Sequence, residues 1–345
     1  MTEKKKIILG ISCGDINGVG LEILIKTFSN NTLFDLCTPI LYAPIFVVNF
    51  YKKLYNWQDF NYHVITDPKN ASPKKLNLIN MDGDDFTVKP GENTELAGKI
   101  AIQSIDLVIR DLKKKNIDVM VTLPVNKQNI ALTDKSFIGH TEHFSKAYDN
   151  TPNLMLLCND NLKIATATNH IPISKVSDSI NRSLLEEKIT ILIKTLKTDF
   201  LISKPKIAVL SLNPHSGDNG LIGDEDIKVI APVVDNFFTS GNLIYGPYSA
   251  DGFFGSGNYK NFDAILGMYH DQALIPFKSM SFGNGVNYTA GLPVIRVSPD
   301  HGVGYDIAGK ELANINSLLS AIFLALEIHK NRLLYLTNIR KTDNK

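Results

Sequence analysis

Residues 263–272 read DAILGMYHDQ, an apolar run followed at once by a histidine, an aspartate and an amide side chain. An apolar run of this length predicts a buried β-strand. The same order, with a histidine one to five residues beyond the run, recurs in TATNHIP (166–172), SLNPHSGDNG (211–220) and RVSPDHG (296–302). Because parallel strands place their carboxyl ends at one edge of a sheet, we expect these histidines to gather there.

Apolar runs of this kind alternate with helical patterns along the chain. Strand-like runs lie at 6–12, 118–123, 163–168, 206–212, 263–269 and 293–298, and apolar residues at three- and four-residue steps predict helices at 20–28, 95–114, 182–196, 224–238 and 314–336. This alternation indicates βαβ units and an α/β fold with parallel sheet. At 345 residues the chain exceeds a usual single domain, so we expect two domains.

The composition is that of an ordinary globular protein, with 44% hydrophobic residues, 21% charged residues and a formal net charge of +1. A net charge this small favours neither nucleic acid nor an anionic membrane as a partner. Cys13, Cys37 and Cys158 are odd in number and lack CxxC spacing, which indicates a reducing compartment, the cytoplasm. The most apolar segment, 318–326, is half as long as the roughly 20 residues that span a bilayer.

His170, His215 and His270 are the candidate metal ligands, because each follows a separate predicted strand. Three imidazoles at rigid strand ends can hold one transition metal and leave coordination positions open for substrate. For any one of them, a hydrogen-bonded loop histidine is the competing interpretation. Their repetition at equivalent positions favours the metal site.

Two further groups of residues predict an anion site. In GHTEHF, His140 and Thr141 precede a helical pattern whose free N–H groups favour an anion, although a simple helix cap at Thr141 explains the pattern as well. Lys278, Asn287 and Arg296 suit a phosphate monoester, with solvated surface charge as the alternative. Arg296 interrupts an apolar strand, and a charge there requires a partner.

The stretch CGDINGVGLEI (13–23) has the GxxxGxG spacing of short-chain dehydrogenases, but a glycine pattern alone is weak evidence. The YxxxK pair that those enzymes need is missing, and neither GxGxxG nor GxxxxGK[ST] occurs. The sequence therefore does not support a conventional dinucleotide fold or a P-loop.

Taken together, the motifs resemble the 4-hydroxythreonine-4-phosphate dehydrogenases of pyridoxal phosphate biosynthesis. The resemblance covers nearly the whole chain and rests on eight motifs in order, GDINGVGLEI, TLPVNK, GHTEHF, ATNHIP, LNPHSGDNGLIGDED, DAILGMYHDQALIPFK, GVNYTAGLPVIR and DHGVGYDIAGK. Departures from the family pattern are Ile16, Asn17 and Leu21 in the first motif and Tyr305 in the last.

The resemblance implies a fold like that of isocitrate and isopropylmalate dehydrogenases, with two α/β/α domains around a cleft and no Rossmann fold. The first domain is expected at 1–129 plus 284–345 and the second at 130–283. A homodimer with its active site at the interface is implied. The same resemblance places a divalent metal (zinc, magnesium, cobalt or manganese) on His170, His215 and His270 and NAD or NADP at His301, Gly302 and Asp306. It places the substrate on His140, Thr141, Lys278, Asn287 and Arg296.

The implied reaction oxidises 4-phosphohydroxy-L-threonine to 2-amino-3-oxo-4-phosphooxybutanoate, which decarboxylates to 3-amino-2-oxopropyl phosphate. Asp251, Asp271 and Lys127 are the candidates for proton transfer or ligand orientation, and structural or surface roles compete with this for each. A dehydrogenase of threonate or erythronate 4-phosphate is the alternative within the class. A phosphate acyltransferase and a non-catalytic binding protein are the alternatives outside it, and they leave the histidines or the DHGVGYDIAG loop without a role.

Overall fold

The structure, a computed structural model, describes residues 6–81, 86–134, 137, 139–281 and 283–343. Its residues divide into two compact units. Unit 1 is Met1–Asn150 with Pro293–His329, and unit 2 is Thr151–Leu292 with Lys330–Lys345. The α/β class expected from the sequence is confirmed, since strands and helices alternate through both units. The chain changes unit at 150/151, 292/293 and 329/330. The domain boundaries at 129/130 and 283/284 stay predictions.

Unit 1 is built on six parallel strands in the order β3-β4-β2-β1-β5-β12. The strands are β1 (Ile7–Ser12), β2 (Cys37–Ala43), β3 (Tyr62–Ile65), β4 (Leu76–Asn80), β5 (Val119–Thr122) and β12 (Arg296–Pro299). Every residue of β2, β5 and β12 is buried. Strands covered on both faces are usually near-continuous apolar runs, which is why the run at 118–123 predicts a strand without alternating polar residues.

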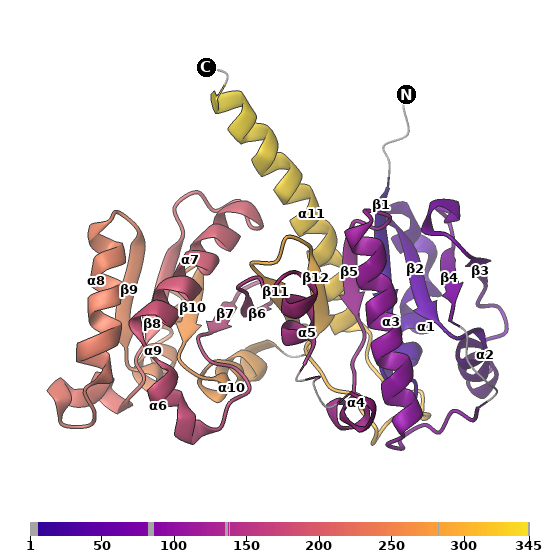
Figure 1. The fold of residues 1–345 in the computed structure, drawn as a ribbon, viewed down its shortest axis with the longest axis horizontal. Helices are drawn as coiled ribbons and strands as arrows, with labels where there is room; N and C mark the ends of the chain where they lie inside the picture. Colours follow the sequence, from indigo (N-terminus) through magenta and orange to yellow (C-terminus); the bar gives the residue numbers. More distant parts are fainter. Residues whose placement is uncertain (1–5, 82–85, 135–136, 138, 282, 344–345) are drawn as a thin grey trace. The chain divides into compact units, whose positions relative to one another are not determined.

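The helices of unit 1 are α1 (Gly20–Phe28), α2 (Ile45–Leu54), α3 (Glu95–Lys113), α4 (Lys127–Thr133), α5 (His140–Ala147) and the first part of α11 (Asn316–Asp343). Helix α3 begins where the Thr94 side chain accepts a hydrogen bond from the Ala97 N–H at 3.2 Å. It then packs across β1, β2 and β5 (Figure 1). This packing covers the central strands of unit 1.

Unit 2 contains six strands in the order β11-β6-β7-β10-β8-β9. They are β6 (Leu154–Cys158), β7 (Lys163–Thr166), β8 (Lys206–Leu210), β9 (Leu243–Tyr248), β10 (Ala264–Gly267) and β11 (Val286–Ala290). Strands β7, β10, β8 and β9 are parallel, whereas β6 is antiparallel to both of its neighbours. The parallel strands agree with the βαβ units expected from the sequence, and antiparallel β6 is an addition to them.

The helices of unit 2 are α6 (Val176–Ser179), α7 (Arg182–Thr198), α8 (Ala231–Thr239), α9 (Ala250–Gly255) and α10 (His270–Ser281). Helix α7 packs against β6 and β11, and α10 against β7 and β10. At the end of α7, buried Asp199 accepts hydrogen bonds from Arg332 Nε of α11 at 2.7 Å and from Tyr288 Oη of β11 at 2.5 Å. These bonds anchor the carboxyl-terminal part of α11 within unit 2. Within the described ranges, no helix has the length and apolarity needed to cross a membrane.

Candidate functional site

The three candidate metal ligands follow three adjacent strands of unit 2. His170 lies after β7, His270 begins α10 directly beyond β10, and His215 lies in the loop after β8. The strand order β7-β10-β8 makes these strands neighbours, and both pairings are parallel. Their carboxyl ends therefore share one edge of the sheet, as the position of each histidine after an apolar run predicts.

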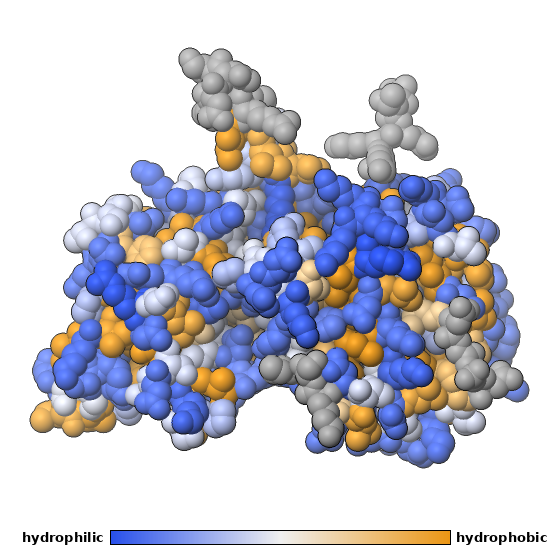
Figure 2. Space-filling view, viewed as in Figure 1, coloured by the Kyte–Doolittle hydropathy of each residue, from blue (hydrophilic) through white to orange (hydrophobic). Residues whose placement is uncertain are grey.

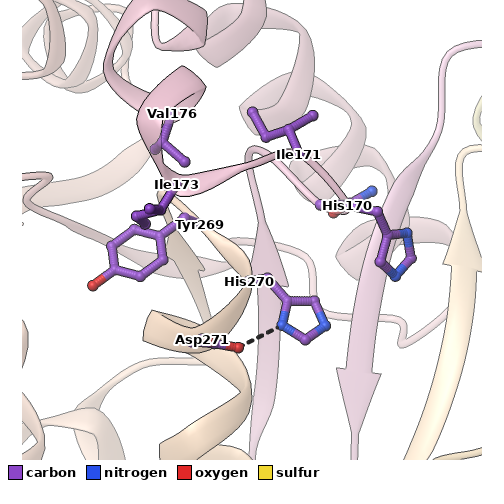
Figure 3. A pocket seen from close by; sticks show the side chains of 8 residues that line it. His170, Ile171, Ile173, Val176, Tyr269, His270 and Asp271 are labelled. Carbon is purple, nitrogen blue, oxygen red and sulfur yellow. Dashed lines mark hydrogen bonds and ion pairs between the residues drawn. The ribbon is translucent and has the colours of Figure 1, made fainter.

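His170 and His270 lie in one pocket, with ring centroids 5.7 Å apart (Figure 3). The pocket has a volume of about 260 Å³ and is lined by Asn169, His170, Ile171, Ile173, Val176, Tyr269, His270 and Asp271. Asp271 Oδ1 lies 2.7 Å from Nδ1 of His270. A carboxylate at this nitrogen stabilises the tautomer with its proton on Nδ1, so Nε2 of His270 carries the lone pair that a metal ion requires.

His215 is not part of this pocket lining. It is exposed and opens a run of six residues with positive φ, from His215 (φ +51) to Gly220 (φ +93). Across the described part of the chain, no three His, Cys, Asp or Glu side chains are grouped so as to hold a metal ion. The structure thus brings His170 and His270 together and leaves His215 on an adjacent strand end, so the three-histidine site stays a prediction.

Two residues that the sequence reasoning missed hold the strand-end loops of unit 2 in place. Gln272 donates from Nε2 to the Ser211 carbonyl and accepts from the Met268 N–H, both at 2.7 Å, so it links the loops after β8 and β10. Buried Asp226 accepts from the N–H groups of Leu212 at 2.7 Å and Asn213 at 3.0 Å. Their positions in the sequence could have pointed to both residues. Gln272 lies two residues beyond His270, and Asp226 ends the motif that contains His215.

Asp251, a candidate proton acceptor, is an exposed residue of α9. Its pKa is lowered mainly by the hydrogen bond from Ser249 Oγ at 2.6 Å, with smaller contributions that include the charge of His215. A carboxylate with a lowered pKa stays ionised at neutral pH and is a weak base. The carboxylate of Asp251 is therefore negatively charged at neutral pH.

Arg296 of β12 is a buried charge in unit 1, with 1% of its surface exposed. Its Nε and Nη2 donate to Thr122 Oγ1 of β5 at 3.1 and 2.6 Å, and its guanidinium carbon lies 5.9 Å from the centre of the Phe144 ring. Burial lowers the pKa of Arg296 to about 9, which leaves the side chain cationic at neutral pH. A positive charge is thus held at the carboxyl end of the unit 1 sheet.

The first turn of α5 brings further polar groups to Arg296. Gly139 occupies the N-cap without a side-chain cap, so Thr141 lies inside the helix and is not its capping residue. Burial lowers the pKa of His140 well below its usual value, and the charges of Arg296, His143 and Lys127 lower it further. His140 is therefore neutral at pH 7, and its buried Nε2 has no hydrogen-bond partner among the described residues.

Lys127 begins α4, and Glu142 of α5 is its carboxylate neighbour. Partial burial lowers the pKa of Lys127, and the charge of Glu142 opposes that shift. Desolvation is thus the main cause of the lowered pKa of Lys127. Glu142 also acts on Arg296, and the sequence reasoning did not select it although it lies in GHTEHF.

The remaining predicted substrate residues belong to unit 2. Lys278 is exposed in the last turn of α10. Asn287 of β11 is half-buried, and its Oδ1 is a buried acceptor with no hydrogen-bond partner in the described part of the chain. Such an acceptor has unused capacity for a donor.

The predicted cofactor residues lie in the loop after β12, in unit 1. His301 Nδ1 is 2.9 Å from the Gly302 carbonyl oxygen, and its Nε2 is buried with no partner among the residues described. Gly302 and Asp306 are exposed, and a Cβ atom at Gly302 would meet nothing within 4 Å. The loop therefore presents exposed backbone at Gly302 beside polar side chains.

Comparison with known proteins identifies a family. The model of the family described as pyridoxal phosphate biosynthetic protein PdxA matches residues 35–325. A 4-hydroxythreonine-4-phosphate dehydrogenase of Bacteroides thetaiotaomicron is 44% identical over 96% of this chain and 91% of its own length. Its counterpart from Sulfurihydrogenibium is 36% identical over 94% of this chain and 99% of its own.

Among solved structures, the chain is similar to 4-hydroxythreonine-4-phosphate dehydrogenase from Klebsiella pneumoniae. The two share 31% identity, with a TM-score of 0.82 over 95% of this chain and 99% of the other. Sequence and fold therefore agree over almost the full length of both proteins.

Proposed function

Because this chain belongs to the PdxA family of pyridoxal phosphate biosynthetic proteins, we propose that it catalyses the NAD-dependent oxidation of 4-phosphohydroxy-L-threonine. The observation that carries the proposal is the 44% identity, over 96% of the chain, to a relative named for this dehydrogenase activity. The polar side chains at the carboxyl ends of the strands in both units support it, since ligands of α/β sheets bind at those ends.

The reaction balances as an oxidation followed by loss of CO2. The C3 hydroxyl gives up its proton, and the hydride on C3 passes to NAD, which forms 2-amino-3-oxo-4-phosphooxybutanoate and NADH. The bond between C2 and the carboxylate then breaks, CO2 leaves, and the electron pair forms an enolate. Protonation at C2 yields 3-amino-2-oxopropyl phosphate. The site must therefore accept one proton and later return one.

His170, His215 and His270 are the residues that would hold a divalent metal. The shared pocket of His170 and His270 and the carboxylate at Nδ1 of His270 support this assignment. A bound divalent cation would lower the pKa of the substrate hydroxyl and stabilise negative charge on oxygen after CO2 loss. Asp271 orients the His270 ring, and Asp251 lies within electrostatic range of His215.

Arg296 is assigned to the substrate phosphate, since it is a buried cation with a planar set of donors. His140, Thr141, Lys278 and Asn287 are assigned to the remainder of the substrate. Lys127 is the candidate base, because partial desolvation favours its neutral form. His301, Gly302 and Asp306 are assigned to the dinucleotide, where the exposed backbone of Gly302 supports the proposal.

We further propose a cytoplasmic homodimer. The three cysteines are buried thiols that form no disulfide with one another, as expected in a reducing compartment. Helix α11 carries four exposed apolar side chains in unit 2, and hydrophobic surface is visible along its described part (Figure 2). They are Leu333, Leu334, Leu336 and Ile339. Exposed apolar side chains gathered on one helix are typical of a protein interface.

The decisive experiment uses protein stripped of metal and reloaded separately with zinc, magnesium, cobalt or manganese. We expect NADH formation and CO2 release from 4-phosphohydroxy-L-threonine only with metal present. D-threonate and D-erythronate 4-phosphates serve as competing substrates, and NADP as the competing cofactor. A higher kcat/KM for either sugar acid would move the assignment to that substrate. If the metal-loaded protein formed no NADH from any of these three substrates, a phosphate acyltransferase or a non-catalytic binding protein would be the remaining functions.

A further inference from the structure

The glycine-rich turn after β1 contacts the loop proposed to bind the dinucleotide. The Val19 N–H donates to the Val303 carbonyl oxygen at 2.9 Å. A Cβ atom at Gly18 would lie 2.7 Å from that same oxygen, so only glycine allows this approach. The turn also reaches the end of β5, where the Asp15 N–H donates to the Pro124 carbonyl oxygen at 2.8 Å. The turn is thus enclosed by neighbouring backbone.

At the centre of these contacts lies the carboxylate of Asp15, which is 1% exposed. Its Oδ1 accepts from the Asn17 N–H at 2.9 Å. Its Oδ2 accepts from Tyr305 Oη and from Asn129 Nδ2, both at 2.8 Å. Asn129 Nδ2 also lies 2.8 Å from Tyr305 Oη, so the three side chains close a ring of hydrogen bonds.

Each member of the ring belongs to a different segment at the carboxyl end of the unit 1 sheet. Asp15 lies in the turn after β1, Asn129 lies on α4 two positions beyond Lys127, and Tyr305 lies in the loop after β12. No cation is among the three donors to the carboxylate, so hydrogen bonds from neutral groups offset the cost of burying its charge. Loss of one donor leaves that charge undersatisfied, which favours movement of the segment that supplied it.

We infer that Asp15, Asn129 and Tyr305 form a positioning triad that holds the 301–310 loop and helix α4 in register and thereby sets the affinity for the dinucleotide. The inference rests on the proposed function, because that function assigns the 301–310 loop to the dinucleotide. The hydrogen bonds of the triad do not depend on that assignment. Tyr305 contributes through Asp15 and is a positioning residue. The glycine-rich turn accordingly serves as the platform for the loop.

The test compares Tyr305→Phe with a matched control, Tyr42→Phe. Tyr42 Oη also bonds a buried carboxylate of unit 1, Asp111 Oδ2 at 3.0 Å, but that pair involves neither the turn nor the loop. We expect Tyr305→Phe to raise KM for NAD by about tenfold and to change kcat by less than about twofold at saturating NAD. Amide hydrogen exchange in 301–310 should become faster, and Tyr42→Phe should alter neither quantity.

Asn129→Ala provides the second arm, because Asn129 belongs to the helix of Lys127. We expect it to raise KM for NAD and also to lower kcat, and its effect on KM should not add to that of Tyr305→Phe in the double variant. The triad would be overturned if Tyr305→Phe changed neither the KM for NAD nor the amide exchange. It would also be overturned if the effects on KM added in the double variant, or if Tyr42→Phe changed KM and exchange as much as Tyr305→Phe does. Absence of NAD reduction by the unsubstituted protein would refute the proposed function instead, and exchange in 301–310 would still decide whether the triad holds the loop.

Discussion

The side chains of the candidate site differ in whether a neighbouring residue orients them. His270 is oriented by Asp271, and Arg296 by Thr122. His215 and Lys278 are exposed. A firmly oriented ligand loses less conformational freedom when it binds, so the partners of His270 and Arg296 contribute to affinity.

Asp271→Asn tests the orientation of His270. The amide is a weaker acceptor than the carboxylate, so His270 Nε2 becomes a weaker ligand. We expect the affinity of the apo protein for zinc or cobalt to fall by about tenfold to 100-fold in calorimetric titration. Asp235→Asn, at an exposed position of α8, is the control. Equal affinities in Asp271→Asn and the control would show that Asp271 does not orient a ligand.

The pH dependence of turnover tests Lys127. A base must be neutral, and the pKa of this ammonium is lowered from its usual 10.5. We expect kcat to rise with pH through an apparent pKa below that value, because the neutral fraction increases. Lys127→Ala should lower kcat by about 100-fold or more and remove this acidic limb, while Lys99→Ala, at an exposed position of α3, keeps it. A limb that persists in Lys127→Ala belongs to another group.

The pH dependence of stability tests Asp15. Burial raises the pKa of Asp15 above its unfolded value, so the folded state binds the proton more tightly than the unfolded state does. The stability linked to this proton is present below the unfolded pKa, about 3.9, and is lost as pH rises through the folded pKa. The free energy of unfolding of the unsubstituted protein minus that of Asp15→Asn should therefore decrease across this window. Denaturant titrations at several pH values measure it, and an increase would contradict the burial argument.

At the scale of elements, contacts between helices place the residues of the site. Helix α4, which carries Lys127 and Asn129, lies against α3 at a point where α3 has no side chain. A Cβ atom at Gly98 would come within 2.1 Å of the Asn129 carbonyl oxygen. The position of α4 therefore depends on a glycine in the middle of a helix, where glycine otherwise costs about 1 kcal/mol relative to alanine.

Gly98→Ala tests this contact. The added methyl group meets backbone that cannot rotate away, so we expect the free energy of unfolding to fall by about 3 kcal/mol and α4 to shift. Gly252→Ala is the matched control, because Gly252 also lies in a helix and its Cβ would meet nothing within 4 Å. The control should be neutral or stabilising by about 0.5–1 kcal/mol in the same denaturant titrations. Similar losses in both variants would show that the close approach is not the cause.

At the scale of the whole molecule, the proposed dimer gives α11 a role beyond its anchor at Asp199. Leu333 and Leu336 are 54% and 53% exposed in the single chain. If this surface is the interface, the Leu333→Asp and Leu336→Asp double variant should sediment as a monomer at concentrations where the unsubstituted protein sediments as a dimer. Lys330→Asp, on the same helix, is the charge control. If the unsubstituted protein itself sedimented as a monomer, the dimer proposal would be refuted.

The sequence by itself determined the α/β class, because strands buried on both faces and amphipathic helices leave periodic patterns that are local. It also determined the family, since eight ordered motifs leave little room for chance. Predicted helices at 20–28 and 95–114 agree with α1 (Gly20–Phe28) and α3 (Glu95–Lys113). These features depend on residues that are close together in the chain.

The tertiary structure decided which strand ends are neighbours. The order β7-β10-β8, which brings His170 and His270 into one pocket, pairs strands far apart in sequence, and no local pattern encodes such pairing. Strand β6 is an apolar run, and its residues do not indicate whether it pairs parallel or antiparallel to its neighbours. The role of Asp15 likewise became visible only where Tyr305, 290 positions later, reaches its carboxylate. Burial and hydrogen bonding between residues so far apart in sequence arise only when the chain packs. The sequence therefore indicated the chemistry of the site but not the residues that position its side chains and loops.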